Sequence, residues 1–414
     1  MKIKKSKAKL VKYYFSIALL TLFTFACSLF SSPPIESTPT TSGEPPQEEI
    51  PAEIIPTETP APVLPIGVLT VKDGVLSLFD REGYTLVQVN AAGLDYANES
   101  NVHILETFSQ GDTNLPIVYF SFEQNNSLLL NNKGQISTLL SNPNFSGLVG
   151  APGKAVIAYT TTEYLNDALV SNLYAANIQS LPTAAPVFSE NNAEGWGLVA
   201  LAVDVEDSQP VGVWYSKRPW GIGGDIVFDP RRTLFRLDLR SGQNTQLLGV
   251  EANPSAISAD KKWVAYTNDQ GTGTGIGVMT IRNISTGENF TYPLQSAVNQ
   301  RGAGAASFSP NNQYLAWMEG SGWQMAEEPN FHSVVRIGDF AGNVVAEFAD
   351  AAFLETSGLS SIQRVEPVGW LDDNTLVVMA RGEHWDDALL IMVELPSQTL
   401  SFLARGVFVG FVYP

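Results

Sequence analysis

Side chains suited to ligand binding are concentrated in a few segments that are rich in glycine and proline and lack the alternation of a strand. Aromatic and arginine side chains in exposed loops supply much of the energy at protein binding sites. The alternative is that they pack over neighbouring strands as small local cores, because a tryptophan in a glycine-rich loop usually needs a surface to lie against. We predict a ligand-binding face formed by Arg218, Trp220, Trp323, His332, His384 and Trp385.

The segment 383–387 reads Glu-His-Trp-Asp-Asp and offers carboxylate oxygens and an imidazole close together. A metal site is conceivable there, but the spacing matches no defensible ligand pattern, so a solvated acidic loop is the favoured interpretation. The chain has three histidines and a single cysteine, which excludes a multi-thiolate site and argues against a histidine-rich metal centre. We therefore predict no metal and no cofactor.

Motifs of enzymes are missing from the sequence. No Gly-x-Ser-x-Gly motif marks a serine hydrolase domain. The glycine-rich run 271–277 lacks the Lys-Ser/Thr pair of a phosphate-binding loop, and we interpret it as a flexible loop. Asp372 and Asp373 fall in a predicted turn, where aspartate suits the turn geometry. We predict that the protein has no catalytic residues and is not an enzyme.

The elements that must position these loops are short strands. From residue 66 onward, apolar runs rich in Val, Ile, Leu, Phe and Tyr alternate with Gly, Asn, Asp, Ser and Pro. One phrase recurs, a strand, a polar turn and a strand that contains Ala and an aromatic residue; it is clearest at 307–317 and 257–266 and weaker at 369–378 and 151–159. Its turn residues are those that a hairpin accepts. A second phrase, a third strand ending in a glycine turn, stands at 76–83, 234–242, 279–287 and 335–342.

Four strands in each repeat of roughly 40 to 60 residues indicate the blades of a β-propeller. Six whole repeats span about 95–140, 145–190, 195–250, 253–295, 302–350 and 363–404. Three strands remain near 66–90, and the isolated run 407–413 is predicted to supply the fourth and close the ring. We therefore expect a single all-β propeller of seven blades. Six or eight blades are the alternatives, because segments 204–209 and 351–363 could hide or imitate a strand.

The Ser-Pro-Asn-Asn and Ser-Ala-Asp-Lys turns, each followed by an Ala-aromatic strand, resemble those of TolB-like, WD-repeat-related β-propellers. The resemblance covers residues 66–414, although the first turn phrase is missing between residues 90 and 144. It implies a propeller fold and little about function.

The first 26 residues carry six lysines and no acidic residue, followed by an apolar run from Tyr13. Cys27 comes directly after Ala26, and this arrangement resembles a bacterial lipoprotein signal, although Thr24 and Phe25 depart from the usual lipobox. We predict that residues 1–26 are a signal peptide and that Cys27 is lipidated. The alternative is an uncleaved anchor that continues to Phe30. Both place the remaining chain outside the cytoplasmic membrane.

Residues 27–65 are predicted to be a disordered tether. Between residues 28 and 65 the chain holds ten prolines and six glutamates with no lysine or arginine. Proline favours extended conformations and like charges repel each other, so this segment should act as a semi-stiff spacer. The net charge of the whole chain is −18, and removing six lysines brings it to −24. Such a chain is repelled by anionic lipid and by nucleic acid, so the lipid must supply the attachment.

We expect a lipoprotein of the bacterial cell envelope, held on the outer side of the cytoplasmic membrane, or in the outer membrane if there are two. Its propeller would be a non-catalytic platform for a protein, a peptide or a glycan. One alternative is a glycan-active enzyme of the glycosidase or lyase type, with carboxylates around the central channel. The other is a purely structural envelope protein.

Overall fold

The computed structural model describes most of the compact unit Thr59–Pro414. The described residues are 62–91, 94, 102–109, 112, 115–121, 127–142, 144–220, 227–268, 277–295, 302–322, 331–384 and 387–414. The predicted signal peptide, Cys27 and the tether up to residue 61 lie outside them. Within these ranges, none of the helical segments has the length and apolar character needed to cross a bilayer.

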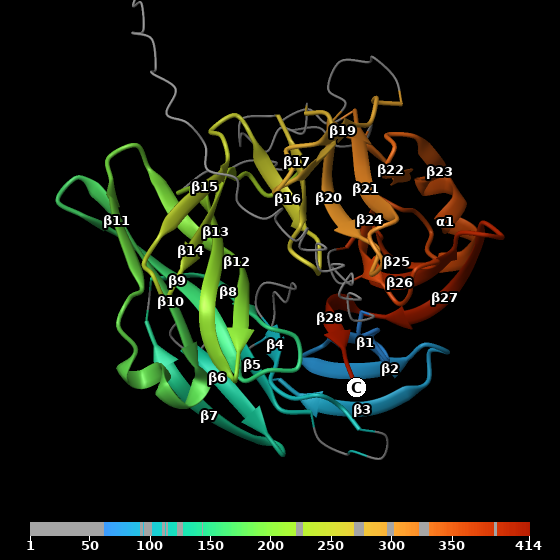
Figure 1. Cartoon of the computed structure of the whole chain (residues 1–414). Helices are drawn as coiled ribbons and strands as arrows, with labels where there is room; N and C mark the ends of the chain where they lie inside the picture. The colour runs from blue at the N-terminus through green and yellow to red at the C-terminus, as the bar shows by residue number, and fades with distance from the viewer. Residues whose placement is uncertain are drawn as a thin grey trace, which may run out of the picture. The chain divides into compact units, whose positions relative to one another are not determined.

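The described residues form seven four-stranded antiparallel sheets arranged as a ring (Figure 1). Blade 1 contains β28 (Val407–Val412), β1 (Gly67–Lys72), β2 (Val75–Asp80) and β3 (Thr85–Asn90). Blade 2 contains β4 (Val102–Ile104), β5 (Ile117–Ser121), β6 (Ser127–Asn132) and β7 (Gln135–Ser141). Blade 3 contains β8 (Phe145–Gly150), β9 (Val156–Leu165), β10 (Ala168–Asn177) and β11 (Phe188–Asn192).

The second half of the ring repeats this order. Blade 4 contains β12 (Trp196–Glu206), β13 (Gln209–Pro219), β14 (Arg232–Asp238) and β15 (Asn244–Leu248). Blade 5 contains β16 (Asn253–Ile257), β17 (Trp263–Thr267), β18 (Thr280–Asn283) and β19 (Asn289–Thr291). Blade 6 contains β20 (Gly302–Phe308), β21 (Tyr314–Ser321), β22 (His332–Asp339) and β23 (Val344–Ala349). Blade 7 contains β24 (Arg364–Trp370), β25 (Thr375–Arg381), β26 (Ala388–Glu394) and β27 (Thr399–Arg405).

The first strands of neighbouring blades contact one another, as β4 does β8, β8 does β12, β16 does β20 and β20 does β24. They therefore surround the axis of the ring. Apolar side chains fill the space between blades; for example, one core cluster joins Leu78 of blade 1 with Leu390 of blade 7. The fold is the predicted seven-bladed β-propeller.

The C-terminal strand closes the ring, as predicted. β28 pairs with β1 in antiparallel register from Gly67 opposite Val412 to Val71 opposite Val407, and Figure 1 shows these two strands side by side. Phe411 of β28 also lies against Gly369 of β24, where a Cβ atom would come within 2.2 Å of the ring. The closing strand is thus held by hydrogen bonds to blade 1 and by ring packing on blade 7.

Two segments differ from the expected pattern. Segment 351–363, which could have imitated a strand, begins with the short helix α1 (Asp350–Ser357), ended by Gly358 in the left-handed conformation. Phe353 anchors α1 in the core between blades 6 and 7, but only two of its residues are buried, so the sequence shows no helical periodicity. The 3₁₀ helix η1 (Ile178–Thr183) likewise follows β10.

The recurring turn phrase folds the same way in blades 5 and 6. The hydroxyl oxygen of Ser258 accepts a hydrogen bond from the backbone N–H of Trp263 at 2.9 Å. The hydroxyl of Ser309 accepts one from the N–H of Tyr314, also at 2.9 Å. Each serine therefore satisfies the amide that begins the second strand of its blade.

The two ends of the blades carry different connections because the strands are antiparallel. We call the end that carries the turns between first and second strands, such as 258–263 and 309–314, the turn face. At the opposite end the second strands end and the third strands begin, as at Pro219 and Arg232 in blade 4 and at Arg381 and Ala388 in blade 7, and we call this end the loop face. Of the residues predicted to bind ligand, the four that the structure describes, Arg218, Trp220, His332 and His384, lie at the loop-face ends of their blades.

Candidate functional site

Two of the predicted binding residues lie together at the loop-face end of blade 4. Arg218 is near the end of β13, and its side chain is 51% exposed with Nε 3.6 Å from an oxygen of Asp229. Trp220 follows the strand, is 44% exposed, and donates its backbone N–H to the carbonyl oxygen of Gly195. This corner of the loop face presents a partly exposed tryptophan and an arginine.

The other predicted residues belong to other blades or lie outside the described part of the chain. His332 begins β22, and its Nδ1 lies 3.0 Å from a carboxylate oxygen of Asp350 at the start of α1. His384 lies between β25 and β26, where its carbonyl oxygen accepts a hydrogen bond from the amide of Asp387. Among the described residues, no hydrogen bond or ion pair joins the two histidines to Arg218 or Trp220. Trp323 and Trp385 are not described.

Much of the basic character around the blade 4 loop is used internally. The guanidinium of Arg232 lies 3.9 Å from the ring centroid of Trp196 and 2.7 Å from a carboxylate oxygen of Glu194. Further along the same connection, Phe228 packs against Met318 of blade 6. The buried part of this loop therefore follows the packing alternative, and its exposed corner remains a predicted binding surface.

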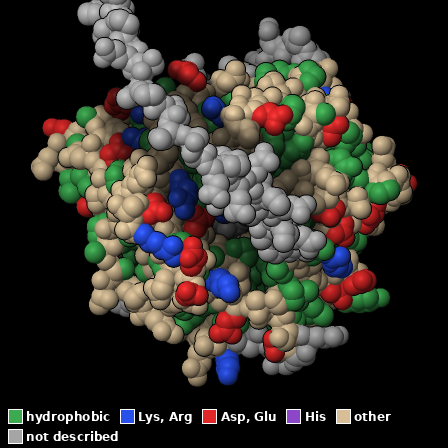
Figure 2. Space-filling view, viewed as in Figure 1, with side chains coloured by type: hydrophobic (Ala, Val, Ile, Leu, Met, Phe, Trp, Pro, Cys, Tyr) green, Lys and Arg blue, Asp and Glu red, His purple; other side chains and the backbone are tan. Residues whose placement is uncertain are grey.

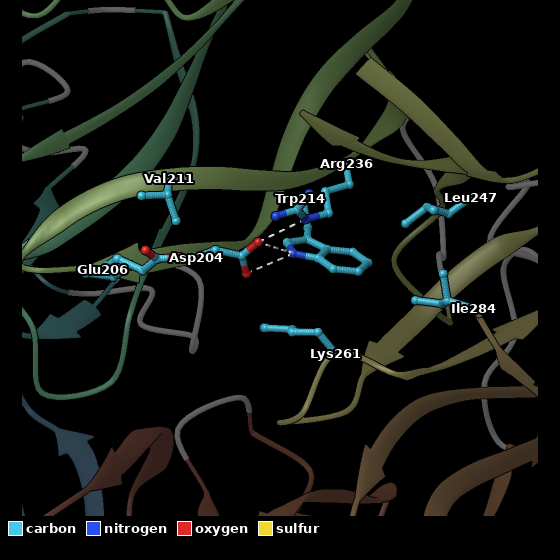
Figure 3. Close-up of a pocket in the computed structure, with 9 residues that line it drawn as sticks. Asp204, Glu206, Val211, Trp214, Arg236, Leu247, Lys261 and Ile284 are labelled. Atoms are coloured by element: carbon cyan, nitrogen blue, oxygen red, sulfur yellow. Dashed lines mark hydrogen bonds and ion pairs between the residues drawn. The ribbon is translucent and has the colours of Figure 1, made fainter. Parts of the chain in front are cut away.

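The turn face carries a pocket that the sequence did not single out. It has a volume of about 420 Å³ and lies where blade 4 meets blade 5 (Figure 3). Strand β12 contributes two acidic residues, β13 a tryptophan, β14 an arginine and the β16–β17 turn a lysine. The lining residues are Asp204, Val205, Glu206, Val211, Trp214, Arg236, Leu247, Lys261 and Ile284.

Asp204 is the centre of a hydrogen-bond network in this pocket. The indole N–H of Trp214 is shared between both carboxylate oxygens, at 3.0 and 3.1 Å, and Nε of Arg236 donates to Oδ2 at 3.0 Å. Gly212, directly opposite Asp204 in the β12–β13 ladder, makes room for this, because a Cβ atom there would lie 2.8 Å from Oδ2. The carboxylate is therefore fixed in place, and each of its oxygens already accepts a hydrogen bond.

Lys261 enters the pocket from the neighbouring blade, and Figure 3 shows its side chain reaching toward Asp204 and Trp214. It stands in the β16–β17 turn with a left-handed φ of 61°. Burial lowers the pKa of its amine, and the nearby charges of Asp204 and Asp260 only partly oppose that effect. In the part of the chain that the structure describes, no ion pair or hydrogen bond holds its ammonium group.

The chemistry of the pocket follows from these contacts. Its carboxylate is already satisfied, and Glu206 at the rim pairs with exposed Arg240. Val211, Leu247 and Ile284 add an aliphatic wall. The pocket can therefore receive a ligand that carries an apolar group next to a hydrogen-bond acceptor. The described residues contain no cluster of three His, Cys, Asp or Glu residues suited to a metal ion.

The surface charges are mixed on the face that Figure 2 shows, where lysines and arginines lie among aspartates and glutamates. The chain as a whole is strongly acidic, with a net charge of −18. Since opposite charges alternate over short distances on that face, local contacts rather than a broad field should decide what binds there.

Sequence reasoning missed the pocket because its residues come from four separate strands and two turns. The strand register shows which of these residues lie opposite one another. Trp214 lies directly opposite Arg236, and Ala202 lies opposite Trp214. Asp204 is two residues from Ala202 and therefore shares its sheet face. Aligning the three strands of blade 4 by their alternation could have brought the acid, the indole and the guanidinium together.

Neither a protein-family model nor a curated protein sequence matches this chain. Several solved structures are similar to this chain. An oligogalacturonate lyase from Vibrio parahaemolyticus is 12% identical with a TM-score of 0.48, over 83% of this chain and 87% of that one. TolB from Acinetobacter baumannii is 12% identical with a TM-score of 0.36, over 80% of this chain and 77% of that one. A puromycin-hydrolysing peptidase of Mycobacterium tuberculosis is 10% identical with a TM-score of 0.47, over 83% and 54%. These similarities concern the propeller fold and carry no conclusion about chemistry.

Proposed function

We propose that the protein is a lipid-anchored, non-catalytic binding propeller of the bacterial cell envelope, whose ligand enters the pocket between blades 4 and 5. One observation carries the proposal. The carboxylate of Asp204 accepts hydrogen bonds from two donors of its own blade, whereas the ammonium of Lys261 faces the same space and has no hydrogen-bond acceptor among the residues that the structure describes. The pocket is thus prepared to accept a group and has no free carboxylate at its centre to transform it.

The contrast with a hydrolase or lyase follows from the needs of general acid–base catalysis. A catalytic carboxyl group must reach a proton of the substrate and must change protonation near the working pH. Asp204 directs its oxygens to Trp214 and Arg236 instead. The second acid of the pocket, Glu206, lies at the exposed rim beside Arg240. The arrangement therefore favours binding over cleavage.

The anchor rests on the N-terminal sequence. A basic segment, an apolar run and Cys27 after a small residue are typical of a lipoprotein signal, and the proline-rich segment that follows would hold the propeller away from the lipid surface. The mass of the N-terminal peptide of membrane-extracted protein tests it. A lipid-modified Cys27 at the N-terminus is expected, and an intact Met1 with unmodified Cys27 would refute the anchor.

Photo-crosslinking tests the binding site. The full chain is produced with p-benzoylphenylalanine at Leu247 in the pocket wall, and separately at Trp220 on the loop face. After irradiation of membranes, we expect a crosslinked species from position 247. An adduct from position 220 alone would move the site to the loop face. No adduct at position 247 in membranes or in envelope extracts would refute the pocket as the binding site.

A further inference from the structure

We propose that the pocket between blades 4 and 5 binds a carboxylate of an acidic peptide, with the Lys261 ammonium donating to the carboxylate and an adjacent aliphatic side chain packing on Leu247 and Ile284. The inference rests on the proposed binding function and names the class of ligand. The carboxylate can belong to an Asp or Glu side chain or to a chain terminus.

The backbone position of Lys261 is the first argument. Its φ of 61° lies in the left-handed region, which Gly, Asn and Asp adopt most easily. The equivalent turn of blade 6 has Asn312 there, with a φ of 56°. A lysine adds no turn-forming advantage, but its longer side chain reaches the space beside Asp204 in the preceding blade. Strained backbone positions of this kind cluster at ligand sites.

The hydrogen-bond inventory of the pocket is the second argument. Lys261 carries three N–H donors, and none of the described residues accepts from them. The nearest carboxylate, Asp204, already takes its hydrogen bonds from Trp214 and Arg236. A half-buried ammonium without an acceptor is costly, and a ligand carboxylate would supply both the acceptor and the opposite charge. A cationic ligand would meet the ammonium instead and find no free carboxylate.

The walls favour a peptide over an acidic sugar. Sugar sites commonly present an exposed aromatic face, but Trp214 is only 3% exposed and packs into the core between blades 4 and 5. The remaining wall is aliphatic, formed by Val211, Leu247 and Ile284. A leucine or valine next to an acidic residue would match this surface, because burying aliphatic area is favourable without directional contacts.

The test uses the full chain in detergent, with its lysines reductively methylated with ¹³C so that each amine gives an NMR signal. The Lys261 signal is assigned with Lys261→Asn, which keeps a residue suited to the turn. Lys262→Asn is the matched control, since Lys262 is the neighbouring lysine and lies 3.6 Å from Asp260. The probes are acetyl-Glu-Leu-amide, its Gln counterpart, acetyl-Ala-Leu with a free C-terminus, and the pair glucuronate and glucose.

We expect the Glu peptide, the free-terminus peptide or both to shift the Lys261 signal and to bind at least about tenfold more tightly than the Gln peptide. This binding should disappear in Lys261→Asn and persist in Lys262→Asn. Equal affinity for the Glu and Gln peptides at a pocket that still crosslinks would refute the carboxylate but leave the binding function intact. Binding of glucuronate in place of both acidic peptides, or no shift with any probe, would refute the peptide assignment.

Discussion

The turns between first and second strands in blades 5 and 6 have the same backbone conformation, but their left-handed residues make different contacts. In each, a serine hydroxyl accepts the amide that starts the second strand, at 2.9 Å, and the fourth turn residue has a left-handed φ. In blade 6 that residue is Asn312, whose side chain hydrogen-bonds Asp260 of the preceding blade and helps to lower the pKa of that carboxyl group, while burial acts against it. In blade 5 it is Lys261, which reaches toward Asp204 and forms no hydrogen bond with any residue that the structure describes.

The comparison separates what the fold requires from what it leaves free. The serine and the left-handed residue are needed to reverse the chain tightly, and both turns meet that need. The side chain at the left-handed position projects over the preceding blade, where it can either tie two blades together or line a pocket. Asn312 does the first, and Lys261 does the second. Under the proposed function, a change of one turn residue would give the propeller a binding site without altering its blades.

The largest effect on stability is expected from deleting the strand that closes the ring. Deleting Val407–Pro414 takes away β28, its hydrogen bonds to β1 and the packing of Phe411 on Gly369. Blade 1 would then have an open inner edge, and we expect a loss of several kcal/mol in the free energy of unfolding, or no folded protein. Circular dichroism during thermal unfolding measures this. Deleting exposed Pro414 alone is the control, and an unchanged melting temperature in the longer deletion would contradict the closure.

Acid should destabilise the protein by protonating His103. The charge of Lys261 should not change in the same pH range. His103 of β4 is buried with Nε2 2.8 Å from the carbonyl oxygen of Lys154, and burial lowers its pKa from 6.5 to about 4 despite that hydrogen bond. Between these pH values only the unfolded chain gains the proton, so the stability present above pH 6.5 is lost toward pH 4, by on the order of 3 kcal/mol.

The two bases can be distinguished because they act in different pH ranges. The pKa of Lys261 is lowered from 10.5, so its unfavourable burial weakens only as the solution becomes alkaline and approaches that value. Urea unfolding at pH 4, 5, 6 and 7 measures the acid range. His103→Gln keeps an N–H donor but cannot titrate, and it should flatten the dependence between pH 6.5 and 4. An unchanged slope in this variant would assign the acid sensitivity to other groups.

The fold could be predicted because the same sequence pattern recurs in several blades of the propeller. The Ser-Pro-Asn-Asn turn at Ser309 and the Ser-Ala-Asp-Lys turn at Ser258 punctuate the strands with the same spacing, and the leftover run 407–413 had only one blade to complete. The helix α1 was missed because two buried residues in eight leave no periodicity to detect.

The site was harder to predict because its parts are brought together by strand register and not by sequence distance. Asp204, Trp214 and Arg236 each look ordinary in their own strand, and their relation appears only when β12, β13 and β14 are aligned. The tryptophans of the predicted loops are conspicuous in the sequence. A lysine in a left-handed turn is not, unless it is compared with the asparagine of the next blade.

Exchanging the two turn residues would test the comparison itself, with the smallest expected change in stability. Lys261→Asn should raise the free energy of unfolding at neutral pH by about 1 kcal/mol, because asparagine accepts the left-handed backbone and no ammonium is then buried. Asn312→Lys should lower it, since the hydrogen bond to Asp260 is lost as well. Urea midpoints at constant m-value measure both changes.

The direction of the stability change in Lys261→Asn distinguishes two roles for Lys261. If Lys261→Asn is more stable than the native protein and no longer responds to acidic peptides, then stability has been given up at this turn for binding. If it is less stable, Lys261 holds the blades together as Asn312 does, and the two turns share one structural task. The Asn312→Lys variant guards against a trivial result, because a general tolerance of lysine at left-handed positions would leave both variants unchanged.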